Sequence, residues 1–265
     1  MNIGNINKIV YPFSIERMGH HGIINWMCNH FDEPVVWVNH INTPPIRSKS
    51  FVEMFDKNHR QKFRFYDRHV NKNPDVYVNM HHATSKQIQL MPKISLVLSS
   101  ANLPINQIGS IVHNDFADQK ICRIYIIRDV YNCLASQLRV PQFQIRDKVH
   151  IYANLMSLIK RYYEHCLSCE QTDDSFYILY NQWFIDKEYR QSIIERMGLE
   201  FTDKGLNQRL MGFEYSVDNK TSRSQDMQVF DRWRQYKDHP FMKRLFQNKE
   251  LVEMCYEIFK FRPKM

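Results

Sequence analysis

The sequence contains little glycine and no long apolar run. Only 7 of its 265 residues are glycine, which excludes glycine-rich repeats and flexible glycine linkers. No apolar stretch approaches the roughly eighteen residues of a membrane-spanning helix, and the first residues lack the charged-then-apolar pattern of a secretory signal. We therefore expect a cytoplasmic protein that makes no membrane contact.

Clustered basic runs and metal-binding patterns are also missing. The net charge of +8 indicates an anionic partner, but no dense lysine and arginine run marks a nucleic-acid face, so nucleic acid is not the expected partner. The six cysteines fall inside periodic segments, as reduced thiols do. Cys166 and Cys169 have CxxC spacing without a second such pair, which favours core packing over zinc. We expect no metal and an activity insensitive to EDTA.

The pattern of apolar residues predicts an α/β fold. A length of 265 residues suits one domain, 1–265, with a sizeable core. Because strands alternate with helices, we expect a mostly parallel central sheet flanked by helices. The predicted strands are 8–13, 34–38, 75–78, 94–98, 109–113, 122–127 and 175–180. The predicted helices begin at 20 and span 147–169 and 186–197, with Gly198 as the C′ residue of the last.

Two further segments are expected to be irregular or helical. Residues 42–73 are polar, aromatic and basic with no clear period, which predicts an insertion or lid with short helices. Residues 225–265 are expected to form C-terminal helices, with Pro240 interrupting them.

Arg128 and Ser136 lie where a predicted strand passes into a helix. The β-branched and aromatic run from Cys122 ends on Arg128, and Ser136 follows eight positions later, about two helical turns on. The two side chains can converge on one anion, because arginine offers a planar fork of donors and serine a hydroxyl. The alternative is that Arg128 simply pairs with Asp129 or another carboxylate.

A second anion-binding segment is predicted near the N-terminus. Arg17 and Gly19 lie in the loop between the first strand and a helix that opens with His20, His21 and Gly22. A basic residue and a glycine before a helix N-terminus are typical of a phosphate cradle. Adjacent histidines on a helix are expected to point in different directions, which favours anion contact over a metal site. An ordinary glycine-capped turn is the alternative.

Together these segments resemble the sulfotransferases that use 3′-phosphoadenosine-5′-phosphosulfate (PAPS). The family's first loop, Pro-Lys/Arg-Ser-Gly-Thr/Ser-Thr, corresponds to Arg17-Met-Gly-His-His21, and the Gly-His-His form is similar to a prokaryotic or viral branch. Its second motif, Arg-Asp/Asn-Pro-x-Asp/Asn-x-x-x-Ser, corresponds to Arg128 through Ser136 with the same spacing. The resemblance implies a P-loop-like sulfotransferase fold, PAPS as the cofactor, and transfer to a hydroxyl or amine, with a saccharide as the expected acceptor.

The resemblance also implies roles for single residues. Arg17, with the amides from Gly19 to Gly22, would hold the 5′-phosphosulfate, and Arg128 with Ser136 would hold the 3′-phosphate. Tyr180 would approach the adenine, against the alternative of a core tyrosine. Arg223, in the polar segment 216–228, would belong to a loop over the nucleotide, against the alternative of a solvated arginine.

The acceptor's proton requires a base with a tunable pKa at the carboxyl ends of the strands. Known members of the family have a histidine in a Lys-Thr-His-Leu-Pro context, where the segment 101–104 of this chain has asparagine. We favour His113, at the end of a predicted strand, with Asp115 and His81 as the next candidates.

Two other functions stay open. An ATP-dependent kinase-like transferase is disfavoured because no Gly-x-x-x-x-Gly-Lys-Ser/Thr occurs. A non-catalytic member of the fold that binds nucleotide or nucleic acid would explain the unusual loop residues.

Overall fold

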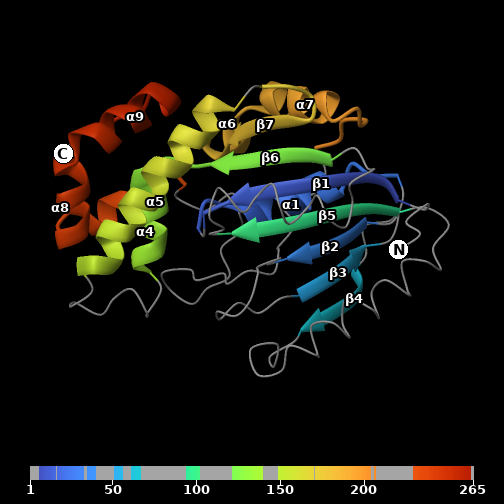
Figure 1. Ribbon diagram of the computed structural model, residues 1–265, viewed down its shortest axis with the longest axis horizontal. Coiled ribbons are helices and arrows are strands. Elements are labelled where there is room, and N and C mark those ends of the chain that lie inside the picture. Colours follow the sequence, from blue (N-terminus) through green and yellow to red (C-terminus); the bar gives the residue numbers. More distant parts are fainter. Residues whose placement is uncertain are drawn as a thin grey trace.

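One mixed sheet organises the described part of the chain, with strand order β4-β3-β2-β5-β1-β6-β7 (Figure 1). The computed structural model describes residues 6–15, 17–32, 35–39, 51–55, 61–66, 94–101, 121–139, 149–169, 171–203, 206 and 229–263. The strands are β1 Ile6–Ser14, β2 Val35–Asn39, β3 Phe51–Phe55, β4 Gln61–Tyr66, β5 Ile94–Ala101, β6 Ile121–Ile127 and β7 Ser175–Leu179. The helices are α1 His20–Cys28, α4 Val130–Leu138, α5 Val149–Ser168, α6 Tyr180–Ile185, α7 Lys187–Arg196, the 3₁₀ helix η4 Arg232–Tyr236, α8 Pro240–Gln247 and α9 Lys249–Phe259.

The sheet is mostly parallel, as the sequence predicts. β2, β5, β1, β6 and β7 are joined by parallel pairings, whereas β3 and β4 pair antiparallel at one edge. The described residues of 42–73 form strands β3 and β4 rather than the expected short helices, and the rest of the range lies outside the described residues. The alternation of apolar and charged residues at Phe63, Arg64 and Phe65 is the two-residue period of a strand. The predicted strands 75–78 and 109–113 lie outside the described residues.

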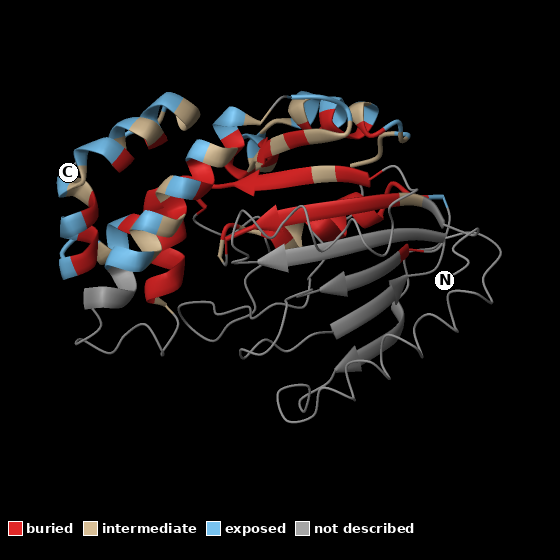
Figure 2. Cartoon of the chain, viewed as in Figure 1, coloured by how far each residue is buried: buried red, intermediate tan, exposed pale blue. Residues whose placement is uncertain are grey.

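Helices pack on both faces of the sheet at β1 and β6, whose residues are mostly buried (Figure 2). Alternate side chains of a strand point to opposite faces. In β1, Ile9, Tyr11 and Phe13 pack with the apolar residues of α4, α5, α8 and α9. Val10 packs on the other face with those of α1, α6 and α7. β6 follows the same alternation, and its interior character explains the near-continuous apolar run of the sequence.

Helix ends follow the predicted capping signals. Asp186 caps α7 by accepting a hydrogen bond from the Tyr189 amide at 2.9 Å, and Gly198 follows the helix with φ +65°. Pro240 is the first residue of α8, a position where proline's missing N–H costs nothing, and it separates that helix from η4. The predicted core role of Cys166 is confirmed, because it is fully buried among the α5 contacts. Within the described residues, no helix is both long enough and apolar enough to cross a bilayer.

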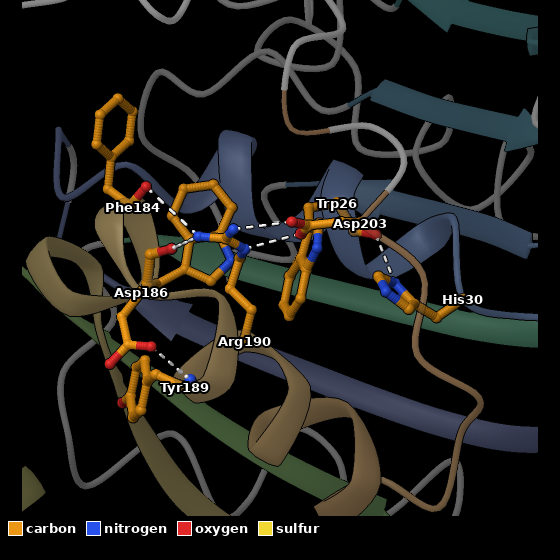
Figure 3. Close-up of polar contacts among 8 residues, drawn as sticks. Trp26, His30, Phe184, Asp186, Tyr189, Arg190 and Asp203 are labelled. Carbon is orange, nitrogen blue, oxygen red and sulfur yellow. Dashed lines mark hydrogen bonds and ion pairs between the residues drawn. The ribbon is translucent and has the colours of Figure 1, made fainter.

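A partly buried ion pair fixes α7 to the chain that follows it (Figure 3). The Arg190 guanidinium donates from Nε and Nη2 to the Asp203 carboxylate at 2.8 and 2.9 Å, and from Nη1 to the Trp183 carbonyl at 2.8 Å. Arg190 is buried, while the Asp203 side chain is 30% exposed. The bidentate geometry uses most of arginine's donors at once.

Replacing Arg190 with methionine is expected to lower the free energy of unfolding by roughly 2–4 kcal/mol, because the partner carboxylate and a carbonyl lose their donors. Urea denaturation measures the loss. Arg196→Met is the matched control on the same helix: its pair with Asp173 is 3.8 Å long and solvated, so the expected cost is below about 1 kcal/mol. Equal losses from the two variants would contradict the assignment.

Candidate functional site at the carboxyl ends of the strands

The carboxyl ends of β1, β6 and β7 meet at one edge of the sheet. Ser14 pairs with Ile126, and Ile127 pairs with Leu179. The segments that follow these strands carry Arg17, Arg128 and Tyr180. The structure therefore brings together the two predicted anion-binding segments, in the crevice where open α/β sheets bind their ligands.

The loop after β1 has an unusual backbone. Arg17 adopts φ +73° and Gly19 φ +91°, both in the left-handed region. Arg17 is not glycine, so this conformation is strained and is held by its surroundings. The Met18 amide closes the turn on the Ile15 carbonyl at 3.1 Å. Within the described residues the buried Arg17 Nε has no hydrogen-bond partner, which leaves a donor for a ligand.

Gly22 belongs to the helix rather than to the loop surface. Its amide donates to the Gly19 carbonyl at 3.1 Å, within the first turn of α1. A Cβ added to Gly22 would lie 3.7 Å from the Trp183 ring. In the structure this amide donates within the helix, and its contact with a phosphate stays a prediction.

His20 and His21 open α1 with their rings in contact. The ring centroids are 4.1 Å apart with the planes 36° from parallel. His20 is buried and His21 is half-buried. The two rings lie against each other, so the expectation that these side chains point in different directions is wrong.

Tyr180 supports the loop and Arg128 at the same time. A Cβ added to Gly19 would lie 2.2 Å from Tyr180 Cε2, so the ring occupies the space that any larger residue would need. The Arg128 guanidinium carbon lies 4.8 Å from the centre of the same ring. Because only 7% of Tyr180 is exposed, this packing favours the core alternative over contact with the adenine of a nucleotide.

Arg128 is buried without a carboxylate partner among the described residues. Its Nη1 donates to the Arg17 carbonyl at 3.4 Å and its Nη2 to the Val229 carbonyl at 3.1 Å. Its Nε is buried and, in the part of the chain described, has no hydrogen-bond partner. The alternative of an Arg128–Asp129 pair does not occur, since the Asp129 carboxylate accepts from Asn132 and Asn181 instead.

Arg232 completes the cluster and was not predicted from the sequence. Its Nη1 donates to Ser136 Oγ at 3.2 Å, and it is buried. Burial, followed by the positive charges of Arg128 and Arg139, lowers the pKa of the Arg232 guanidinium to about 10. Arginine stays charged at neutral pH even so. We name Arg128, Arg232 and Ser136 the arginine site.

Arg232 lies nine positions after Arg223, the arginine that the family resemblance assigns to a loop over the nucleotide. Arg223 lies outside the described residues, as do His113, Asp115 and His81. Arg232 contacts Ser136, and the charge of Arg128 contributes to the lowered pKa of Arg232; the convergence of Arg128 and Ser136 on one anion stays a prediction.

Comparison with known proteins identifies a structural neighbour. No protein-family model matches the chain, and no curated protein sequence matches it. Among solved structures, the sulfotransferase domain from the Synechococcus PCC 7002 olefin synthase is similar with a TM-score of 0.53 and 15% identity. The match covers 98% of this chain and 97% of that domain. The chain therefore has the α/β fold of a sulfotransferase domain.

Proposed function

We propose that this protein is a sulfotransferase that uses PAPS as donor and a hydroxyl or amine, most simply on a saccharide, as acceptor. The observation that carries the proposal is the arginine site. Two buried guanidinium groups lie near each other, and among the described residues no carboxylate forms an ion pair with either. Such a surplus of buried positive charge is offset by a dianion, and a terminal phosphate carries close to two charges.

The described residues fit a nucleotide with phosphate groups at both ends. Arg128, Arg232 and Ser136 would hold a 3′-phosphate, because they offer a free guanidinium donor and a hydroxyl. Arg17, Gly19, His20 and His21 would hold the 5′-phosphosulfate at the other segment, where Arg17 Nε has no partner within the described chain. PAPS, when bound, supplies the activated sulfuryl group.

The protein's own contribution to such a reaction is positioning and charge. Sulfuryl transfer resembles phosphoryl transfer in needing reactants held in line and developing charge stabilised. Arg17 would provide that charge from a backbone fixed by the turn at Gly19, since a preorganised donor needs no rearrangement during the reaction. A base placed near the acceptor, for which His113 is our candidate, would take its proton.

Adenosine 3′,5′-bisphosphate is expected to bind more tightly than adenosine 5′-monophosphate, and Arg128→Ala is expected to remove most of the difference. A lost charge-assisted contact costs roughly 1.5–3 kcal/mol, or about tenfold or more in affinity. Arg232→Ala is expected to reduce the affinity difference between the two nucleotides in the same way. Isothermal titration calorimetry measures the affinities.

Arg234→Ala is the matched control, because Arg234 lies two residues from Arg232 in η4 but its side chain is 67% exposed and pairs with Asp231. We expect it to bind the bisphosphate within about twofold of the wild type. Equal affinity of the wild type for the mono- and bisphosphate would rule out the 3′-phosphate site.

A thermal-shift panel separates the rival functions. Ligands that bind the native state raise the melting temperature by mass action. Stabilisation by adenosine 3′,5′-bisphosphate supports the proposal, whereas stabilisation by ATP with magnesium alone would favour a kinase-like transferase. Stabilisation by DNA alone would favour a nucleic-acid-binding member of the fold. PAPS turnover with a saccharide panel then tests the acceptor class.

A further inference from the structure

The segment 229–233 is joined to the strand-to-helix junction of β6 and α4 by four hydrogen bonds. Arg128 Nη2 donates to the Val229 carbonyl at 3.1 Å, and Arg232 Nη1 donates to Ser136 Oγ at 3.2 Å. The other two bonds both go to Asn132. Its Nδ2 donates to the Phe230 carbonyl at 2.9 Å, and its Oδ1 accepts from the Trp233 amide at 3.3 Å. Asn132 therefore hydrogen-bonds to the backbone on both sides of Arg232, at the Phe230 carbonyl and the Trp233 amide.

Asn132 is itself held by a buried carboxylate. Its Nδ2 lies 3.0 and 3.1 Å from the two Asp129 oxygens, and its backbone amide donates to Asp129 Oδ1 at 2.9 Å. Asn181 donates to Asp129 Oδ2 from the other side at 2.9 Å. Asp129 and Asn132 are fully buried. A buried carboxylate needs such donors, so it fixes the plane of the Asn132 amide.

An amide is the one side-chain group that meets all these demands. It must donate to the Asp129 carboxylate and to the Phe230 carbonyl, and it must accept from the Trp233 amide. Asparagine carries two N–H donors and one oxygen acceptor on one rigid plane. An aspartate in the same place would accept from Trp233 but would face Asp129 with a like charge, and when ionised it has nothing to donate to Phe230.

We propose that Asn132 is a positioning residue that fixes the 229–233 segment against α4 and thereby places Arg232 at the arginine site. Asn132 acts through Arg232 and is not expected to touch the ligand itself. Its effect on nucleotide affinity rests on the proposed function, whereas its effect on the 229–233 segment does not. Without the Asn132 contacts, the hydrogen bonds left between the segment and this junction in the described residues are the two from Arg128 and Arg232, while Val229 and Trp233 remain packed in the core.

The matched pair of variants is Asn132→Asp and Asn181→Asp. Each places a second carboxylate beside Asp129, but only Asn132 contacts the 229–233 segment. Two neighbouring carboxylates share a proton with a raised pKa, so each variant is protonated at low pH and loses that proton as the pH rises through the raised value. The shared proton removes the repulsion between the two carboxylates, but its single O–H does not replace both donors of the amide. The defect of Asn132→Asp should therefore grow between about pH 5 and pH 8.

The readout is hydrogen exchange of peptides covering 229–236, without nucleotide and relative to the wild type at the same pH. We expect Asn132→Asp to raise exchange there by about tenfold or more at pH 8 and by less near pH 5, where the repulsion is relieved. Asn181→Asp should leave the segment within about twofold. Bisphosphate affinity, measured in parallel, should fall about tenfold or more in Asn132→Asp alone.

The double variant Asp129→Asn with Asn132→Asp swaps the two side chains. It separates the effect of where the amide lies from the effect on stability. It restores one amide beside one carboxylate and keeps a good helix cap, but leaves the Phe230 carbonyl without its donor. We expect recovered thermal stability with fast exchange in 229–236. Wild-type exchange and affinity in this folded variant would overturn the proposal, as would equal exchange in the two single variants. A wild type that binds no bisphosphate would reject the proposed function, while the exchange result would still decide the role of Asn132.

Discussion

Gly19→Ala is expected to destabilise the protein by roughly 2–4 kcal/mol and to abolish nucleotide binding at ligand concentrations that saturate the wild type. A left-handed backbone conformation costs an alanine about 1 kcal/mol. The new methyl group would also lie 2.2 Å from the Tyr180 ring. That ring cannot move aside cheaply, because it is buried and packs against Arg128 and Trp183. Overpacking of this kind costs a further 1–3 kcal/mol or so.

Gly198→Ala separates the two causes. Gly198 has a similar positive φ of +65°, but an added Cβ would meet nothing nearer than Lys8 Nζ at 3.8 Å. Denaturant unfolding should therefore show a loss of only about 1 kcal/mol. In a Tyr180→Ala background, Gly19→Ala should fall to a similar value, because the clash is gone. Equal costs for Gly19→Ala with and without the Tyr180 ring would show that the ring does not constrain the loop.

His113→Ala is expected to lower turnover by roughly 10²–10⁴-fold while leaving nucleotide affinity nearly unchanged, if His113 removes the acceptor's proton. Residue 113 lies outside the described residues, so the prediction rests on the sequence. Steady-state kinetics with PAPS and a responsive acceptor, alongside bisphosphate titration, measures both quantities.

Arg17→Ala provides the contrast for His113, because its charge would act on the ground state and the transition state alike. We expect it to damage both affinity and turnover. If His113 is instead structural, His113→Ala would lower the melting temperature and preserve turnover per folded molecule. Normal turnover in a folded His113→Ala variant would reject His113 as the base and move attention to Asp115 and His81.

The sequence predicts this fold well where local signals are strong. The apolar runs of β1 and β6 and the helical spacing of α5 each fix an element without reference to the rest of the chain. α6 was missed because it begins at Tyr180 directly after β7, with no turn residue or cap between them. β3 and β4 were missed because each is only five or six residues long, within a polar and aromatic segment that shows no clear period over its whole length.

The candidate site was predictable only in part. Arg17, Gly19 and Arg128 carry their signal in local spacing. Arg232 does not, because its closeness to Ser136 is a contact between residues 96 positions apart, which no pattern within one segment reports. The packing of Tyr180 on Gly19 is equally long-range, and it shows why a residue next to a predicted ligand can serve the fold instead.

The place of β1 in the sheet has a consequence during synthesis of the protein on the ribosome. β1 precedes the other described strands in the chain, yet both its neighbours, β5 and β6, come much later. At a synthesis rate of about 5–20 residues per second, the 87 residues from Ser14 to Ala101, the end of β5, take roughly 4–17 seconds. Until then β1 has neither partner, so its apolar stretch from Ile9 to Phe13 is a natural binding segment for ribosome-associated chaperones.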